Sequence, residues 1–353
     1  MAKAHANALD RLPMFFPDAP DVERSVLVGR TRDAVEEAAE RLGFDRVETD
    51  WEDAIADIDV LYNLGPTRIH VEPTVTALEN DVHVLCEKPL ALTVDEARRM
   101  ASVARRSDAL AGIGFNYRYV PAIRLAKRMA DAGAFGEIRR FRGQYFQDWL
   151  ADSNDPWSWR NDAERAGTGV LGDVGAHTID LARWLVGDIG SVMGHLRTFV
   201  DERPVEGTDE RRPVTTDDEY SAFVDFTSGA MGSMEGSRVA TGHKGDNVIE
   251  IYGTEGGFRF EMERLNELEV QTRDDDGWER ILVTDDDHPY MDAWWPTGHI
   301  IGWEHTFIHE SYQFLSAIAK DGEFRPNFAE GLAVQKVLDA VERSHDTGSR
   351  ITL

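Results

Sequence analysis

The sequence predicts an α/β protein in which a doubly wound, parallel-sheet domain precedes an α+β domain with a large, mostly antiparallel, open sheet. In the first third of the chain, strand-like stretches alternate with helical stretches of about ten residues, the pattern of a parallel sheet. Further along, strand-like stretches follow one another with hairpin-sized gaps, which indicates antiparallel pairing. The 353 residues, 42% of them apolar, suffice for two domains with separate cores.

The elements of the first domain, at residues 1–116, are marked by their boundaries. Pro13 is expected to end the opening helix because proline lacks the N–H that a helix needs. Gly43 is expected to close the next helix in the left-handed conformation that favours glycine. The predicted elements are helix Ala2–Leu12, strand Val22–Val28, helix Asp33–Leu42, strand Ile58–Asn63, helix Thr67–Glu79, strand Val82–Cys86, helix Val94–Arg106 and strand Leu110–Phe115.

The second domain, at residues 117–353, begins where this alternation stops. One long helix is predicted over Thr168–Val186, and two more close the chain at Glu304–Ala319 and Phe328–Ser344. The strands expected between them are Ser191–Val200, Glu219–Phe226, Ala230–Arg238, Asn247–Tyr252, Gly257–Glu261, Glu267–Gln271 and Arg280–Val283.

The chain is strongly acidic, with 65 Asp and Glu residues against 38 Lys and Arg residues and a formal net charge of −27. This charge repels phosphate backbones and anionic lipid surfaces, so we expect no nucleic-acid or membrane partner. Molar salt screens the self-repulsion of such a chain, which favours a halophilic source. An ordinary acidic protein is the alternative.

Cys86 is the only cysteine, which excludes an intramolecular disulfide framework and a cysteine-rich metal site. We therefore predict no metal. No apolar run approaches the ~18 residues of a membrane span, and the first residues lack the apolar core of a signal peptide. A soluble, cytoplasmic protein is expected.

Cys86-Glu87-Lys88-Pro89 follows a strand whose residues are typical of a buried strand. In an open α/β sheet, ligands bind beyond the carboxyl ends of the strands, so Lys88 is a candidate acid or base there. Pro89 restricts the local backbone and is a candidate for the cis form. The alternative is a surface lysine on a turn.

Two further segments carry candidate chemistry. Asp173 and His177 lie four residues apart in a predicted helix, hence on one face, and a carboxylate can hold an imidazole in one tautomer. A solvated surface pair is the alternative.

Arg30 and Arg32 follow a strand end that usually contacts a cofactor ribose, where an arginine accommodates a 2′-phosphate. The alternative is two exposed arginines.

These segments, with Gly114-Phe115-Asn116-Tyr117-Arg118, Trp159-Arg160 and Gly169–Leu185, resemble the Gfo/Idh/MocA family of oxidoreductases over essentially the whole chain. The stretches Trp157–Asp173 and Gly302–Phe307 are most similar to its levoglucosan dehydrogenase-like branch, which acts on cyclic sugars. The resemblance implies a Rossmann-type first domain and a homo-oligomer, dimeric or tetrameric, often formed through the open sheet.

The resemblance also implies a function: oxidation of a ring hydroxyl of a sugar or polyol (an inositol, an aldose or an anhydrosugar) by hydride transfer to NAD or NADP. Lys88, Asp173 and His177 match catalytic positions of the family, and Trp159 and Arg160 match substrate contacts. Arg30 and Arg32 favour NADP over NAD as the cofactor. Positions near the nicotinamide and its ribose are matched by Asn63, Gly65, Pro66, Glu87 and Asn116.

The chain departs from the family at its start. In the family, a strand and a G-x-G-x-x-G turn precede a segment resembling Ala2–Leu9, so the first strand of the sheet is missing here. Without that central strand, ladder hydrogen bonds are lost on both neighbouring strands. We hypothesise a misplaced start codon and a longer native protein. The alternative is a natural variant without standard dinucleotide binding.

Two other functions remain open at this point. One is a redox-neutral enzyme with a retained cofactor, catalysing glycoside hydrolysis or elimination and releasing no NAD(P)H. The other is a non-catalytic sugar- or nucleotide-binding homologue, which the absent glycine turn favours and the set Lys88, Asp173 and His177 disfavours.

Overall fold

The computed structural model describes all residues from Met1 to Leu353, and they form two compact units. Unit 1 comprises Met1–Ala91, Asp95–Tyr119 and Gly302–Leu332, and unit 2 comprises Leu92–Val94, Val120–Ile301 and Ala333–Leu353. The first unit is therefore not a single stretch of the chain, because residues 302–332 return to it. No helix has both the length and the apolar character that crossing a bilayer requires.

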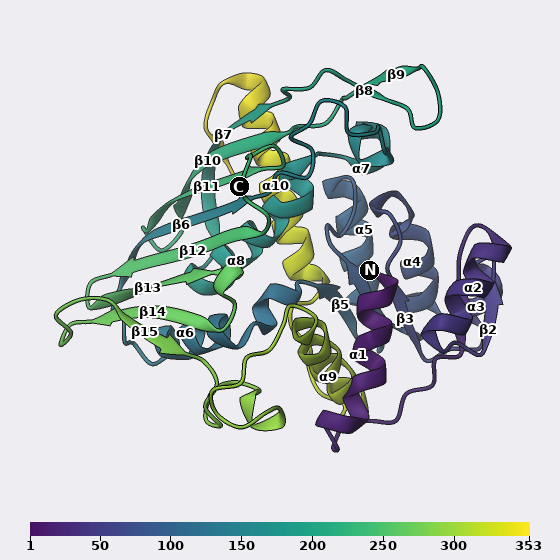
Figure 1. Ribbon diagram of the computed structural model, residues 1–353, viewed down its shortest axis with the longest axis horizontal. Helices are drawn as coiled ribbons and strands as arrows, with labels where there is room; N and C mark the ends of the chain where they lie inside the picture. Colours follow the sequence, from purple (N-terminus) through teal and green to yellow (C-terminus); the bar gives the residue numbers. More distant parts are fainter. The chain divides into compact units, whose positions relative to one another are not determined.

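The parallel sheet predicted for the first domain is present in unit 1, in two parts (Figure 1). Three parallel strands run in the order β3 (Val60–Asn63), β4 (His83–Glu87) and β5 (Ala111–Gly114). A separate parallel pair is formed by β1 (Val26–Val28) and β2 (Arg46–Glu48). The helices that alternate with these strands are α2 (Arg32–Leu42), α3 (Glu52–Ile55), α4 (Val71–Glu79) and α5 (Val94–Ala104).

Several boundaries in unit 1 differ from the prediction. Strand β1 is shorter than the predicted Val22–Val28, and the strand β2 and the helix α3 were not predicted. The expected end at Gly43 is confirmed, because Gly43 caps α2 with a φ of 72°. The predicted end at Pro13 is wrong, because α1 spans Ala2–Phe15 with Pro13 inside it.

Packing explains why α1 continues past Pro13. Leu12 and Phe16 are buried, and the ring of Phe16 stacks on Tyr312 with 4.2 Å between centroids. Tyr312 belongs to α9 (His305–Ala319), the helix that packs against α1. Apolar burial at the end of the helix thus outweighs the one backbone hydrogen bond that a proline removes.

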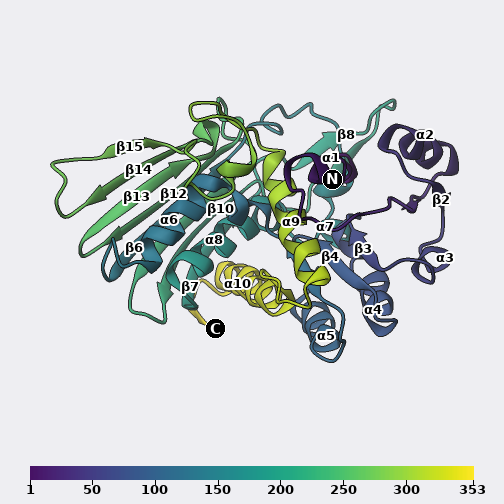
Figure 2. The ribbon, with the colours of Figure 1, turned by 90° about the horizontal axis from the view of Figure 1, so that it is seen from below.

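Unit 2 contains a nine-stranded sheet in the order β15-β14-β13-β12-β6-β11-β10-β7-β16 (Figures 1 and 2). The pair β6–β11 is parallel and the other neighbouring pairs are antiparallel, so the prediction of a mostly antiparallel sheet is confirmed. The strands are β6 (Ile138–Phe146), β7 (Ile189–Arg197), β10 (Glu219–Phe226), β11 (Met231–Ser237), β12 (Asp246–Gly253), β13 (Gly256–Glu261), β14 (Glu267–Thr272), β15 (Glu279–Leu282) and β16 (Ile351–Thr352).

One face of this sheet carries helices and the other is open. Along β10, Tyr220, Ala222 and Val224 are buried, whereas Phe223 between them is 63% exposed, the alternation of a strand with one solvated face. Figure 2 shows the helices of unit 2 lying along the sheet. They are α6 (Pro121–Asp131), α8 (Ala176–Val186) and the part of α10 (Phe328–Thr347) that belongs to unit 2.

The long helix predicted over Thr168–Val186 is not uniform. Leu171–Gly175 form a π-helical segment, η4, and α8 begins only at Ala176. Helix α6 and the central strand β6 were not predicted. The remaining elements are η1 (Thr67–Ile69), η2 (Asn116–Tyr119), η3 (Trp159–Asn161), α7 (Ala163–Ala166), β8 (Glu202–Pro204), β9 (Arg211–Pro213), η5 (Met262–Arg264) and η6 (Met291–Ala293).

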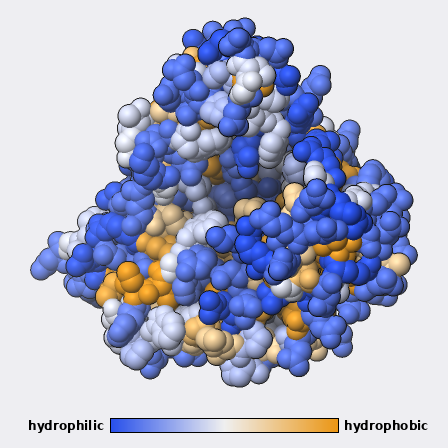
Figure 3. All heavy atoms as spheres, turned by 45° about the vertical axis from the view of Figure 1, so that its right-hand side comes forward, coloured by the Kyte–Doolittle hydropathy of each residue, from blue (hydrophilic) through white to orange (hydrophobic).

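The surface agrees with the acidic composition. On the face drawn in Figure 3, hydrophilic residues predominate and apolar residues gather in small patches. Acidic residues outnumber basic ones in the whole chain by 65 to 38.

Candidate active site

Three parallel strands of unit 1 end side by side at the residues predicted to bind a cofactor. The register pairs Asn63 with Cys86 and Glu87 with Gly114, so the carboxyl ends of β3, β4 and β5 form one edge. Asn116 follows β5 by two residues. Open α/β sheets bind their ligands beyond this edge. The structure thus brings together residues from three separate parts of the sequence.

Glu87, the last residue of β4, is buried and receives two hydrogen bonds. Nε2 of His5 lies 2.9 Å from its Oε1, and the backbone N–H of Lys88 donates to its Oε2 over 3.2 Å. Burial acts to raise the pKa of Glu87, but the hydrogen bond and charge of His5 and the charge of Lys88 outweigh it, so this pKa is lowered. His5 was not predicted, because its partner lies 82 positions away.

Lys88 is half-buried directly beyond this carboxylate, and the Lys88–Pro89 peptide bond is cis. The turn that contains it is tied to the neighbouring one by His70. Nδ1 of His70 lies 3.0 Å from the carbonyl oxygen of Pro89, and Nε2 lies 2.9 Å from that of Gly65. Burial lowers the pKa of His70, against the carbonyl oxygens that favour its charged form. His70 was also missed by the sequence analysis.

The two predicted asparagines are buried and hydrogen-bonded within unit 1. The side-chain amide of Asn63 donates to the carbonyl oxygen of His70 and to Oγ1 of Thr74, each over 3.0 Å. The amide of Asn116 donates to Oγ1 of Thr306 over 2.8 Å. In both residues the side-chain amide N–H groups thus bond to loop and helix residues of unit 1.

The end of β1 presents the two predicted arginines. Arg30 is exposed and forms no ion pair in the structure, whereas Arg32 pairs with Glu36 one turn along α2 at 3.3 Å. Exposed pairs of this kind contribute little energy. Arg30 therefore offers a free guanidinium beside the strand end.

In unit 2, Asp173 lies in η4 and His177 in the first turn of α8. His177 is buried and Asp173 is half-buried. The segment packs closely against β10: a Cβ on Gly175 would lie 2.9 Å from the ring of Tyr220. A glycine is needed at this position because the backbone approaches the ring so closely.

Trp159 and Arg160 lie in the short helix η3, which Ser158 and Asn161 cap reciprocally. The guanidinium of Arg160 lies over the ring of Trp159, 4.5 Å from its centroid. Arg160 is exposed, so its charge and the indole face form one cation–aromatic pair at the surface of unit 2.

The strand-end residues of unit 1 fit a nicotinamide dinucleotide. They offer a free guanidinium after β1, the Gly65–Pro66 turn after β3, a carboxylate at the end of β4 with a lysine after it, and an amide after β5. With an antiparallel-sheet unit that carries an Asp–His segment, this arrangement defines a two-domain, dinucleotide-dependent oxidoreductase.

Comparison with known families agrees. Residues 1–115 match the model described as oxidoreductase family, NAD-binding Rossmann fold, and residues 123–259 match the GFO/IDH/MocA C-terminal domain. The chain belongs to the Gfo/Idh/MocA family of oxidoreductases, and its first domain is an NAD-binding Rossmann domain.

Three relatives illustrate the similarity. Levoglucosan dehydrogenase of Pseudarthrobacter phenanthrenivorans is 39% identical over 98% of this chain and 93% of its own. An oxidoreductase domain protein from Kribbella flavida is 43% identical, with a TM-score of 0.96 over 99% of this chain and 95% of that one. A levoglucosan dehydrogenase in complex with NADH and levoglucosan is 39% identical, with a TM-score of 0.96 over 99% and 95% of the two chains.

Proposed function

We propose that this protein oxidises a ring hydroxyl of a cyclic sugar or polyol, such as an anhydrosugar, an aldose or an inositol, with NAD or NADP as the hydride acceptor. The observation that carries the proposal is the full-length similarity to levoglucosan dehydrogenase, at 39% identity over 98% of the chain. The Glu87-Lys88-Pro89 strand end and the Asp173–His177 segment, both present in the structure, support it.

The acid–base chemistry belongs to three side chains of this protein. Hydride loss from a carbon requires that its hydroxyl lose a proton, and a bound nicotinamide supplies the hydride acceptor. His177 takes the proton, and Asp173 holds the imidazole in the required tautomer. Lys88 is the second acid–base candidate, and the roles of Lys88 and His177 are exchangeable in this scheme. General-base help is worth ~10²–10⁴ in rate.

Two further pairs of residues are assigned to binding: Trp159 and Arg160 to the substrate, and Arg30 and Arg32 to the cofactor. The Trp159–Arg160 pair offers an aromatic face and a guanidinium to a sugar ring and its hydroxyls. Arg30 and Arg32 follow β1, and the residues after this strand usually contact the cofactor ribose in a doubly wound fold. The free guanidinium of Arg30 favours a 2′-phosphate there. Replacing Arg30 with Ala is therefore expected to weaken NADP binding more than NAD binding, measured by calorimetry.

The decisive experiment is a turnover screen. The purified chain is incubated with levoglucosan, aldoses and inositols and with NAD or NADP, and reduced nicotinamide is followed by its absorbance. We expect Lys88→Ala and His177→Ala to lose about 10²-fold or more in turnover while cofactor binding survives. Lys336→Ala and His243→Ala, which replace exposed residues, are the matched controls.

The other outcomes identify the alternatives. Conversion of a glycoside without net NAD(P)H indicates the redox-neutral reaction. Sugar binding without any conversion indicates a non-catalytic homologue. Near-parental turnover in both Lys88→Ala and His177→Ala contradicts the acid–base assignment.

We also propose that the protein is a homo-oligomer, a dimer or tetramer, formed through the open face of the nine-stranded sheet. Met193 and Phe223, paired across β7 and β10, are 46% and 63% exposed there. An exposed apolar patch marks an interaction site. Met193 and Phe223 begin a row of residues that are paired from strand to strand across the sheet. The row continues with Ser233, Arg142, Glu250, Arg259, Glu269 and Arg280.

The charges of this row support a second copy as the partner. Arginines and glutamates alternate along it, so this strip is nearly neutral on a chain whose net charge is −27. Two copies repel each other least where such a balanced strip lies in the interface. Light scattering is expected to show an oligomer that Phe223→Asp dissociates. Phe199→Asp, at an exposed phenylalanine outside the sheet, is the control.

A further inference from the structure

A short stretch of unit 2, Thr216–Asp218, lies between the two segments that carry the candidate substrate and acid–base residues. The carbonyl oxygen of Asp217 accepts a hydrogen bond from the backbone N–H of Val170 over 3.1 Å. One residue before this stretch, the N–H of Thr215 donates to the carbonyl oxygen of Asn161 over 2.9 Å. The stretch thus connects the turn after Arg160 with the segment that leads into Asp173.

The carboxylate of Asp217 holds the start of the π-helical segment. Its Oδ1 accepts the N–H of Gly169 over 2.6 Å, and its Oδ2 accepts the N–H of Leu171 over 2.8 Å. Asp217 is buried, and a Cβ on Gly169 would lie only 2.0 Å from the carbonyl oxygen of Asp217. Both carboxylate oxygens therefore bond to amides that lie two and four residues before Asp173.

Asp218 and Arg238 form a buried ion pair beside it. Nε of Arg238 donates to Oδ1 of Asp218 over 2.9 Å, and the two side chains are 4% and 0% exposed. The second oxygen of Asp218 accepts the backbone N–H groups of Phe199 and Val200. Burying such a pair costs desolvation energy that an apolar pair of similar size would avoid, so stability alone does not explain it.

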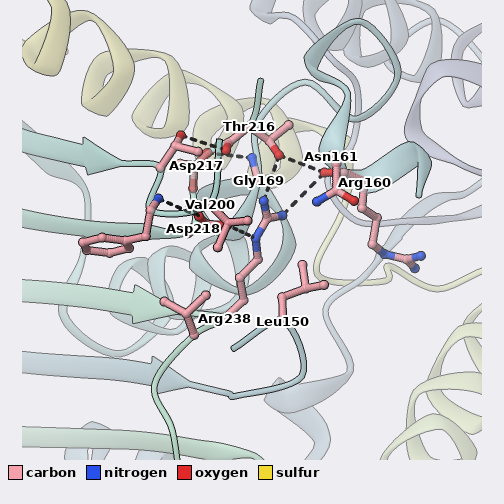
Figure 4. Close-up of polar contacts among 12 residues, drawn as sticks. Leu150, Arg160, Asn161, Gly169, Val200, Thr216, Asp217, Asp218 and Arg238 are labelled. Atoms are coloured by element: carbon pink, nitrogen blue, oxygen red, sulfur yellow. Dashed lines mark hydrogen bonds and ion pairs between the residues drawn. The ribbon is translucent and has the colours of Figure 1, made fainter. Parts of the chain in front are cut away.

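The remaining donors of Arg238 reach the turn that carries Arg160 (Figure 4). Nη2 donates to Oγ1 of Thr216 over 2.9 Å, and Nη1 donates to the carbonyl oxygen of Arg160 over 3.4 Å. The hydroxyl of Thr216 donates to the same carbonyl oxygen over 3.0 Å. Figure 4 shows the side chain of Arg160 pointing away from this network, so the network holds its backbone and leaves its guanidinium exposed.

We propose that Asp217 and the Thr216–Arg238 pair are positioning residues: Asp217 sets the segment that carries Asp173 and His177, and Thr216 and Arg238 set the turn that presents Arg160. This inference rests on the proposed function, because it assigns those residues to proton transfer and substrate contact. One stretch of three residues then places both groups relative to each other within unit 2.

Thr216 allows a test with a matched pair of variants. Thr216→Val keeps the size and removes the hydroxyl, and Thr216→Ser restores it. We expect Thr216→Val to raise KM for the sugar about tenfold with kcat changed by less than about threefold, and Thr216→Ser to behave like the parent, because small misplacements of a binding group are costly. In the Arg160→Ala background, Thr216→Val is expected to have no further effect on KM.

Asp217 is tested by a different readout. Asp217→Asn keeps one acceptor and turns an N–H group toward the second amide. We expect faster hydrogen exchange at the amides of Gly169 and Leu171, and kcat lower by about 10–100-fold at nearly constant KM. Asp201→Asn, at an exposed site, is the matched control.

The outcomes separate this proposal from the proposed function. If the parent protein turns over no sugar, the proposed function fails, while hydrogen exchange at Gly169 and Leu171 still decides whether Asp217 holds the segment. Unchanged exchange at these two amides overturns the role of Asp217. Equal losses in Thr216→Val and Thr216→Ser, or additive effects with Arg160→Ala, overturn the role of Thr216 and Arg238.

Discussion

Nε2 of His5 lies 2.9 Å from Oε1 of Glu87, and both side chains are buried. The contact joins the first helix of the chain to the strand end that carries Lys88, the proposed acid–base residue. The other oxygen of Glu87 accepts the backbone N–H of Lys88, so a single carboxylate links His5 to the position of the lysine. A buried carboxylate that loses such a donor is left with a large desolvation penalty.

Replacing His5 with Ala is expected to destabilise the protein by about 3 kcal/mol, because it leaves the buried Glu87 carboxylate with only the backbone N–H of Lys88 as a hydrogen-bond donor. The pKa of Glu87 is lowered in the folded protein, so its ionisation contributes stability above pH ~4.5 that is lost as the pH falls through the folded value. In His5→Ala this loss begins at higher pH. Urea unfolding at several pH values measures both effects. If the parent and His5→Ala begin to lose stability at the same acidic pH, this account is wrong.

Replacing His70 with Leu is expected to cost about 1–3 kcal/mol, because the neutral imidazole donates its one N–H to a carbonyl oxygen, of Gly65 or of Pro89, and leucine cannot replace this hydrogen bond. Burial lowers the pKa of His70, so its neutral form contributes stability that is complete above pH ~6.5 and is lost as the pH falls below that value. The variant therefore loses this part of the pH dependence. His299→Leu, at an exposed histidine, is the control, and equal unfolding midpoints in the two variants would exclude the role of His70.

The pH dependence that Glu342 gives to stability is opposite in sign to that of Glu87 and His70. Burial and the negative charges of Asp217, Asp339 and Asp346 raise its pKa to about 7. Its protonation therefore stabilises the fold below pH ~4.5, and this stability is lost as the pH rises to about 7. We expect Glu342→Gln to be more stable than the parent by about 1–2 kcal/mol at pH ~8 and nearly equal at pH ~5. Thermal unfolding at both pH values tests this, with Glu323→Gln as the exposed control.

Salt is expected to stabilise the chain, because its net charge of −27 makes the compact state repel itself. The screening length falls from about 10 Å at 0.1 M salt to about 3 Å at 1 M, so most of the gain is expected within this range. Unfolding free energies in chloride salt, with sucrose as the uncharged comparison, provide the measurement. Equal stability at about 0.1 M and 3 M salt contradicts both the electrostatic argument and a halophilic source.

Local sequence was sufficient for most of the fold. Strand-like stretches between helical ones predicted β3, β4 and β5, and successive strand-like stretches predicted the main strands of the antiparallel sheet, because these patterns depend only on local apolar spacing. The same reasoning failed at β6, which lies between β12 and β11 in the middle of the sheet. The first residues of β6, Ile-Arg-Arg-Phe-Arg, place charged side chains on the open face of the sheet and few apolar ones on the other face. The apolar pattern that identifies a strand is therefore weak here.

The site shows the same division. Short motifs were enough to nominate Glu87, Lys88, Asp173 and His177 as candidates, since strand ends and helix spacing are local properties. The residues that hydrogen-bond to these segments could not be found from the sequence. Asp217 and Gly169 are 48 positions apart, and His5 and Glu87 are 82 positions apart. A residue's hydrogen-bonding partner at such a separation depends on how the whole chain folds.

The sequence by itself determined the class of fold, the acidic surface and the family of the protein, because these follow from periodicity, composition and contiguous motifs. Only the tertiary structure decided which buried polar groups are paired. It placed Arg238 against Asp218 and the carbonyl oxygen of Arg160, and His70 between two strand-end turns. The reason is energetic: a buried polar group must find a partner, and that partner is whichever residue the fold brings within hydrogen-bonding distance.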